Sequence, residues 1–91
     1  MSDGWGTPVE RERRNRILVS VAAYAYEMLS TSIMSDEAFD ILASEINPSR
    51  STGRPDVDAF FRKHFNPHTG MWIRLHPDLT GVRRIYERHW A

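Results

Sequence analysis

Four histidines and two pairs of aspartates are the side chains whose type and spacing in this sequence could support chemistry. His64 and His68 stand four residues apart, which is the spacing at which one face of a helix can hold a metal ion. Asn66 and Pro67 lie between them, and proline interrupts the helix that such a site would need. No glutamate takes the catalytic position of a His-Glu-x-x-His motif either. We therefore expect surface or half-buried histidines and no metal site.

The aspartates pair as Asp36 with Asp40, on one face of a predicted helix, and as Asp56 with Asp58. Paired carboxylates can act as general acid and general base. Acids at the start of a helix are also explained by capping and by the positive end of the helix dipole. The sequence has no cysteine, no glycine-rich phosphate-binding loop and no Gly-x-Ser-x-Gly motif. We expect a protein that is not an enzyme and that needs no cofactor.

The overall charge argues against nucleic acid as a partner. Twelve basic residues balance twelve acidic ones, so no global positive field attracts a phosphate backbone. No apolar run approaches the roughly 20 residues of a membrane span, and the first residues do not resemble a signal peptide. We therefore expect a cytoplasmic protein that does not contact a membrane.

Helical periodicity dominates the first half of the sequence. Thr7, Pro8 and Glu10 have the pattern of a capping box with proline at the first helical position, and they predict the start of a long helix. We expect the charged run over residues 10–16 to form its solvated first turns. The apolar residues that follow extend beyond one helix face, so this helix is either central to the domain or shares its second side with another copy in a homodimer. They are Ile17, Leu18, Val21, Ala22, Tyr24, Ala25, Met28 and Leu29, together with Val19, Ala23 and Tyr26.

Two shorter helices are predicted next. Ser35 has the position of a cap for the second helix, which Pro48 stops. The loop over residues 47–55 is longer than a helix-turn-helix motif tolerates between its helices, which argues against a DNA-reading pair. We expect Asp56 to cap the third helix.

The end of the chain contains a connector and one more helix. Residues 71–75 are predicted to form a short extended segment or a packed connector, and the last helix to begin at His76-Pro77 or at Thr80. We therefore expect one mainly α domain over residues 1–91, a compact bundle of about four helices with a short irregular or extended segment at 71–75. Residues 1–6 are expected to form a loose arm.

The sequence from Tyr24 to Ile46 contains the pattern Tyr-x-Tyr, a spacer, and Ser-Asp-x-x-aromatic-Asp-x-Leu-x-x-Glu-Ile. This pattern resembles the N-terminal helical subdomain, called Ia, of NAD-dependent DNA ligases. The resemblance implies a site for the nicotinamide half of NAD or of nicotinamide mononucleotide (NMN), with Tyr26, Asp36, Phe39 and Asp40 as ligand-binding residues. Phe39 stands where the family usually has tyrosine. The Lys-x-Asp-Gly nucleophile motif of the ligases is missing, because the single lysine lies in Lys63-His64-Phe65-Asn66, so we expect no adenylyl transfer.

The second half of the sequence, from Asp58 to Leu79, resembles small proteins of bacteriophages and prophages. This resemblance implies a phage accessory protein in the host cytoplasm, a class in which inhibitors of host or defence-system proteins are frequent. Tryptophan, tyrosine and arginine dominate interface hot spots. We therefore expect a protein partner, bound through Trp72, Arg74, Arg83, Arg84, Tyr86, Arg88 and Trp90. The nicotinamide site is the first alternative, and a patch of the C-terminal arginines that binds nucleic acid is the second.

Overall fold

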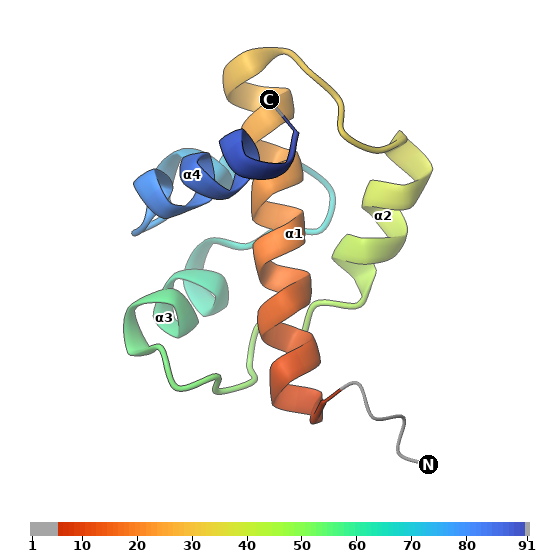
Figure 1. Ribbon diagram of the computed structural model, residues 1–91. Helices are drawn as coiled ribbons and strands as arrows, with labels where there is room; N and C mark the ends of the chain where they lie inside the picture. Colours follow the sequence, from red (N-terminus) through yellow and green to blue (C-terminus); the bar gives the residue numbers. More distant parts are fainter. Residues whose placement is uncertain (1–5, 91) are drawn as a thin grey trace.

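A computed structural model describes residues 6–90 and is organised around one long central helix (Figure 1). Helix α1 (Pro8–Leu29) is followed by α2 (Asp36–Ser44), α3 (Pro55–His64), the short 3₁₀ helix η1 (Met71–Leu75) and α4 (Leu79–His89). In Figure 1, α2 lies on one side of α1, and α3 and α4 lie on the other. The described residues contain no strand, and the predicted mainly α bundle of about four helices is confirmed. Apart from Gly6, the predicted N-terminal arm lies outside the described residues.

The start of α1 confirms the predicted capping box. The Thr7 hydroxyl accepts a hydrogen bond from the Glu10 N–H at 3.2 Å, and the Glu10 carboxylate accepts one from the Thr7 N–H at 2.8 Å. The helix ends at Ser30, whose left-handed backbone (φ 55°) lets the next N–H, that of Thr31, return to the Ala25 carbonyl at 2.9 Å. Both ends are therefore fixed by local sequence.

The middle of α1 forms the centre of the core. Seven consecutive residues from Val19 to Ala25 are buried, because α2, η1 and α4 all pack against this helix. The middle of the wide apolar surface predicted for α1 is thus covered by this chain itself, as expected for a helix central to the domain. Four residues of the predicted apolar surface, Ile17, Tyr26, Met28 and Leu29, are instead exposed.

The second half of the chain adds the remaining core. Phe61 of α3 and Ile73 of η1 are fully buried. Residues 71–75 form a packed 3₁₀ connector, so the extended alternative is wrong. The predicted cap of α3 is also wrong, since Arg54 occupies that position and no side chain in the described structure caps α3. Helix α4 begins with Asp78 as its cap, whose carboxylate accepts the Gly81 N–H at 3.1 Å.

Candidate binding pocket

A pocket of about 280 Å³ lies between α1, α2 and the turn that precedes η1. Tyr26, Asp36, Phe39 and Asp40 all line it, so the structure brings together the four residues predicted from the ligase resemblance. We call it the acidic pocket. Its other lining residues are Ala22, Ala23, Glu27, Ser32, Ile33, Met34, His68, Thr69 and Gly70.

The local structure of α2 explains how two acids face this pocket. Ser35 caps the helix by accepting the Ala38 N–H at 3.0 Å, and this bond fixes the first turn. Asp36 and Asp40 are then four residues apart and lie on the same face. Phe39 packs against the core with part of its ring, whereas the Tyr26 side chain on α1 is 60% exposed. An exposed aromatic ring opposite two carboxylates is therefore available to a ligand.

The far wall of the pocket is the turn that leads into η1. Gly70 approaches α1 so closely that a Cβ at this position would lie 3.2 Å from the Ala23 Cβ. The Thr69 carbonyl accepts the Trp72 indole N–H at 2.6 Å, and the Thr69 hydroxyl accepts the Met71 N–H at 3.1 Å. The two hydrogen bonds fix the shape of the turn, and the close approach of Gly70 places it against the middle of α1.

Carboxylates dominate the charge of the pocket. Glu27, Asp36 and Asp40 line it, and the Arg74 Nη2 lies 3.9 Å from the Glu27 carboxylate. The same Nη2 donates to the Glu27 carbonyl at 3.2 Å, so this guanidinium is held at the end of α1. The arrangement can hold a positively charged group between carboxylates and aromatic rings. Within residues 6–90, no cluster of three potential metal ligands was found.

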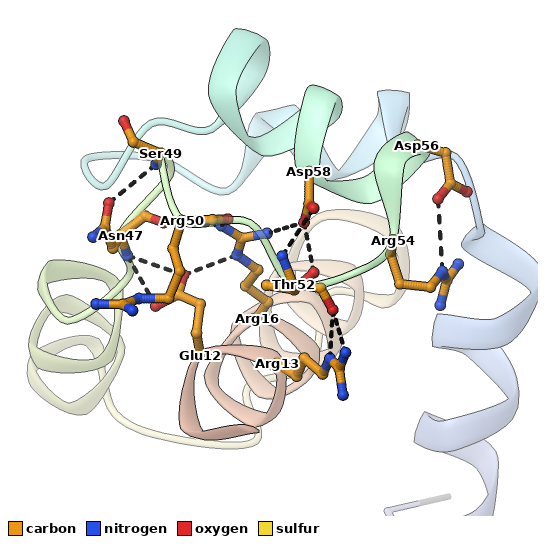
Figure 2. A network of polar contacts seen from close by, with 10 residues as sticks. All are labelled: Glu12, Arg13, Arg16, Asn47, Ser49, Arg50, Thr52, Arg54, Asp56 and Asp58. Atoms are coloured by element: carbon orange, nitrogen blue, oxygen red, sulfur yellow. Dashed lines mark hydrogen bonds and ion pairs between the residues drawn. The ribbon is translucent and has the colours of Figure 1, made fainter. Parts of the chain in front are cut away.

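A buried network of charges, which the sequence did not predict, lies below the loop that joins α2 to α3 (Figure 2). Arg16 on α1 is only 3% exposed. Its guanidinium donates to the Glu12 carboxylate at 2.8 Å and to the Asp58 carboxylate at 2.9 Å. It also donates to the Asn47 carbonyl at 2.9 Å and the Arg50 carbonyl at 3.0 Å. The expected solvated first turns of α1 are therefore wrong for Glu12 and Arg16.

Asp58 is the second centre of this network. It accepts the Thr52 N–H at 2.9 Å and the Thr52 hydroxyl at 2.5 Å as well as the Arg16 bond. Burial alone would raise the pKa of the Asp58 carboxyl, but these hydrogen bonds and the Arg16 charge outweigh burial and hold the pKa below its ordinary value of 3.8. The carboxylate therefore stays charged, and it ties the loop to α1.

The predicted partner-binding residues separate into buried and exposed groups. Trp72 is 5% exposed and packs among Phe60, Phe61 and Phe65, so it belongs to the core and cannot contact a partner in this structure. Tyr86 is half-buried, with its ring 6.0 Å from that of Tyr24. The residues on the surface are Arg74, Arg83, Arg84, Arg88 and Trp90, and among them Arg83 pairs with Glu87 at 3.1 Å.

The chain matches no protein-family model, no curated protein and no solved structure. The resemblances to the ligase subdomain and to phage proteins thus stay predictions. No helix in the described part of the chain is long and apolar enough to cross a membrane.

Proposed function

We propose that the protein is a non-catalytic binding protein whose acidic pocket takes a ligand with a planar, positively charged group. The observation that carries the proposal is that Tyr26, Asp36, Phe39 and Asp40 line a single pocket. The oxidised nicotinamide ring of NAD and NMN is the cation that the ligase resemblance implies. Such a ring can lie against an aromatic face, where the cation is attracted by the π electrons, while the carboxylates offset its charge.

The size of the pocket limits which part of a dinucleotide it can take. Binding sites for whole small molecules usually enclose about 300–1,000 Å³, and the acidic pocket has about 280 Å³. We therefore propose that it takes the nicotinamide ring with its ribose, and that the rest of a dinucleotide stays outside. Lys63 is not among the residues that line the pocket, which fits a protein that binds without forming a covalent intermediate.

The test is a calorimetric titration with nicotinamide riboside, in its oxidised form and in its reduced form, whose ring carries no charge. We expect the oxidised form to bind and the reduced form to bind at least about tenfold more weakly, a difference of about 1.4 kcal/mol. Asp40→Asn should weaken binding of the oxidised form. The matched control is Asp56→Asn, which removes a carboxylate that does not line the pocket. Equal binding of the two forms, or no heat at millimolar ligand, would contradict the proposal.

A second proposal concerns a protein partner. The Trp90 side chain is 40% exposed at the end of α4, and Arg84 and Arg88 are exposed on the same helix. In Figure 1 this end of α4 crosses α1 near its C-terminal turns, where Met28 and Leu29 are also exposed. We propose that this surface binds a host or defence-system protein, as an inhibitor in the host cytoplasm. Tryptophan and arginine are enriched in interface hot spots.

A pulldown with tagged protein tests this second function, in nuclease-treated and untreated lysates. A stoichiometric protein that is retained in both lysates and lost in Trp90→Ala would support it. Tyr26→Ala is the matched control, because it removes an exposed aromatic side chain from the acidic pocket instead. Retention only without nuclease would indicate nucleic acid bound by the arginines, and an empty pulldown would contradict a protein partner.

A further inference from the structure

A second cavity, of about 190 Å³, lies between α1, α3 and α4. We call it the α3–α4 cleft. It shares no lining residue with the acidic pocket. Its volume exceeds that of an engineered apolar cavity of about 150 Å³ that binds benzene. The apolar side chains that line it are Ile17, Val57, Phe61, Val82 and Ile85.

One hydroxyl in this cleft has no partner. Ser20 is 1% exposed, and its Oγ is the buried side-chain polar atom in the described residues that makes no hydrogen bond. A buried hydroxyl without a partner costs free energy, and alanine would suit the middle of a helix better than serine. The chain uses alanine at Ala22, Ala23 and Ala25, one turn further along the same helix. A buried polar atom without a partner is thus kept at the wall of this cleft.

Hydrogen-bond donors surround the same cleft. The Arg13 guanidinium donates through Nε and Nη2 to the Thr52 carbonyl, which fixes its plane beside the cavity. Arg54 also lines the cleft, and its exposed ion pair with Asp56 is 3.6 Å long. The charge of Arg16, by contrast, is balanced by the buried carboxylates that it binds.

His76 supplies a further donor. Its Nδ1 accepts the Asp78 N–H at 2.9 Å, so a neutral ring carries its proton on Nε2. Burial and the Arg54 charge lower the pKa of His76, although Asp78 and Asp56 act in the opposite direction, and the ring is neutral near pH 7. Asp78 is the acid that lines the cleft, and its carboxylate already accepts the Gly81 N–H that begins α4. The polar groups free to meet a ligand are therefore mainly donors.

We propose that the α3–α4 cleft binds a small aromatic carboxylate that carries a second polar group at the far end of its ring. The ring lies against Phe61, Val82 and Ile85. The carboxylate is bound by Arg13 and Arg54, and the second polar group bonds with the Ser20 hydroxyl. A ligand of this class would satisfy the unpartnered hydroxyl, the apolar walls and the two guanidinium groups together.

The experiment is an NMR titration of the ¹⁵N-labelled full chain with benzoate, benzamide and 4-hydroxybenzoate. We expect saturable shifts at Ser20, Val57 and Ile85, with dissociation constants in the millimolar range for ligands of this size. Benzoate should bind about tenfold more tightly than benzamide because its carboxylate pairs with arginine. The hydroxyl of 4-hydroxybenzoate should add a further gain. Equal binding of benzoate and benzamide, or shifts that do not saturate, would overturn the proposal.

Two variants separate the two ends of the ligand. Arg54→Gln should reduce the preference for benzoate over benzamide, because Arg13 alone then binds the carboxylate, whereas Arg84→Gln, which changes an exposed arginine outside the cleft, should leave the preference unchanged. Ser20→Ala should remove the gain from the 4-hydroxyl and leave benzoate binding unchanged. Ser20→Ala should also fold with undiminished stability, because it deletes an unpartnered group. A marked loss of stability, or an unchanged gain from the 4-hydroxyl, would mean that Ser20 does not serve a ligand.

Discussion

Asp58→Asn should lower the stability strongly although it changes the shape of the side chain very little. The carboxylate accepts two bonds from Thr52 and one from Arg16, all in the interior. Removing one partner of a buried ion pair usually costs about 3–5 kcal/mol, because the other charge stays buried without compensation. Asparagine keeps one oxygen for Thr52, and Arg16 keeps Glu12, so we expect about 3 kcal/mol. The free energy of unfolding of a single domain is about 5–15 kcal/mol in total, so this loss is a large part of the stability.

The assay is urea unfolding at pH 7, followed by tryptophan fluorescence, to which the buried Trp72 contributes. Asp56→Asn is the matched control, since it makes the same change two residues away on a side chain that is exposed. We expect no measurable loss in the control. A loss below about 1 kcal/mol in Asp58→Asn, the value typical of surface pairs, would refute the reasoning.

The pH dependence of the same variant gives a second check. The folded state lowers the pKa of Asp58 below 3.8, so its contribution to stability is complete above the pKa of the unfolded chain. That contribution is lost as the pH falls through the lower pKa of the folded state. The difference in unfolding free energy between the wild type and Asp58→Asn should therefore be constant near neutral pH and shrink below about pH 4. A difference that persists undiminished in acid would contradict the proposed charge of the carboxylate.

Three further outcomes are expected. Thr7→Ala should lower the stability by about 1 kcal/mol in urea unfolding because it removes the cap of α1, whereas Thr7→Ser should retain it. Gly70→Ala should destabilise by about 1–3 kcal/mol in the same assay, because the added Cβ would meet the buried Ala23, which cannot move away; equal stability would mean that the turn shifts freely. An NMR titration of His76 should give a pKa below 6.5, since burial disfavours the charged ring, and protonation should then destabilise the fold as the pH falls; a pKa above 6.5 would contradict this.

Local signals in the sequence predicted the features of the fold that depend on neighbouring residues. The capping box at Thr7 and the cap at Ser35 each depend on residues within one helical turn. Helix α2 ends at Ser44, earlier than the stop predicted at Pro48. Helix α3 ends at His64, before Pro67, which agrees with the prediction that no helix continues from His64 to His68. The two helix starts and the break before His68 could be predicted from the sequence without knowledge of the fold.

The burial of Glu12 and Arg16 could not be predicted in this way. Their spacing of four residues is as typical of a surface pair as of a buried one. What buries them is the loop over residues 47–54, whose carbonyl groups and Asp58 lie more than thirty positions away in the sequence. Trp72 was misassigned for a related reason, because an aromatic residue in a short connector shows no periodicity that distinguishes core from surface. In both cases tertiary contacts determine which residues are buried.

Helix α1 explains how so small a domain can keep two separate cavities. Glu12 and Arg16 hold the loop at the exit of α2, Arg13 and Ser20 line the α3–α4 cleft, and Tyr26 lines the acidic pocket. Successive residues of a helix are about 100° apart around its axis, so residues at different positions along α1 can line cavities on different faces of the helix. Because the Glu12 carboxylate accepts the Asn47 N–H at 3.0 Å, the chain leaving α2 is anchored to the N-terminal half of α1. The buried charges thus fix the C-terminal end of the helix that carries Asp36 and Asp40, and through Arg16, which lies 4.8 Å from the centre of the Phe61 ring, they also contact the core.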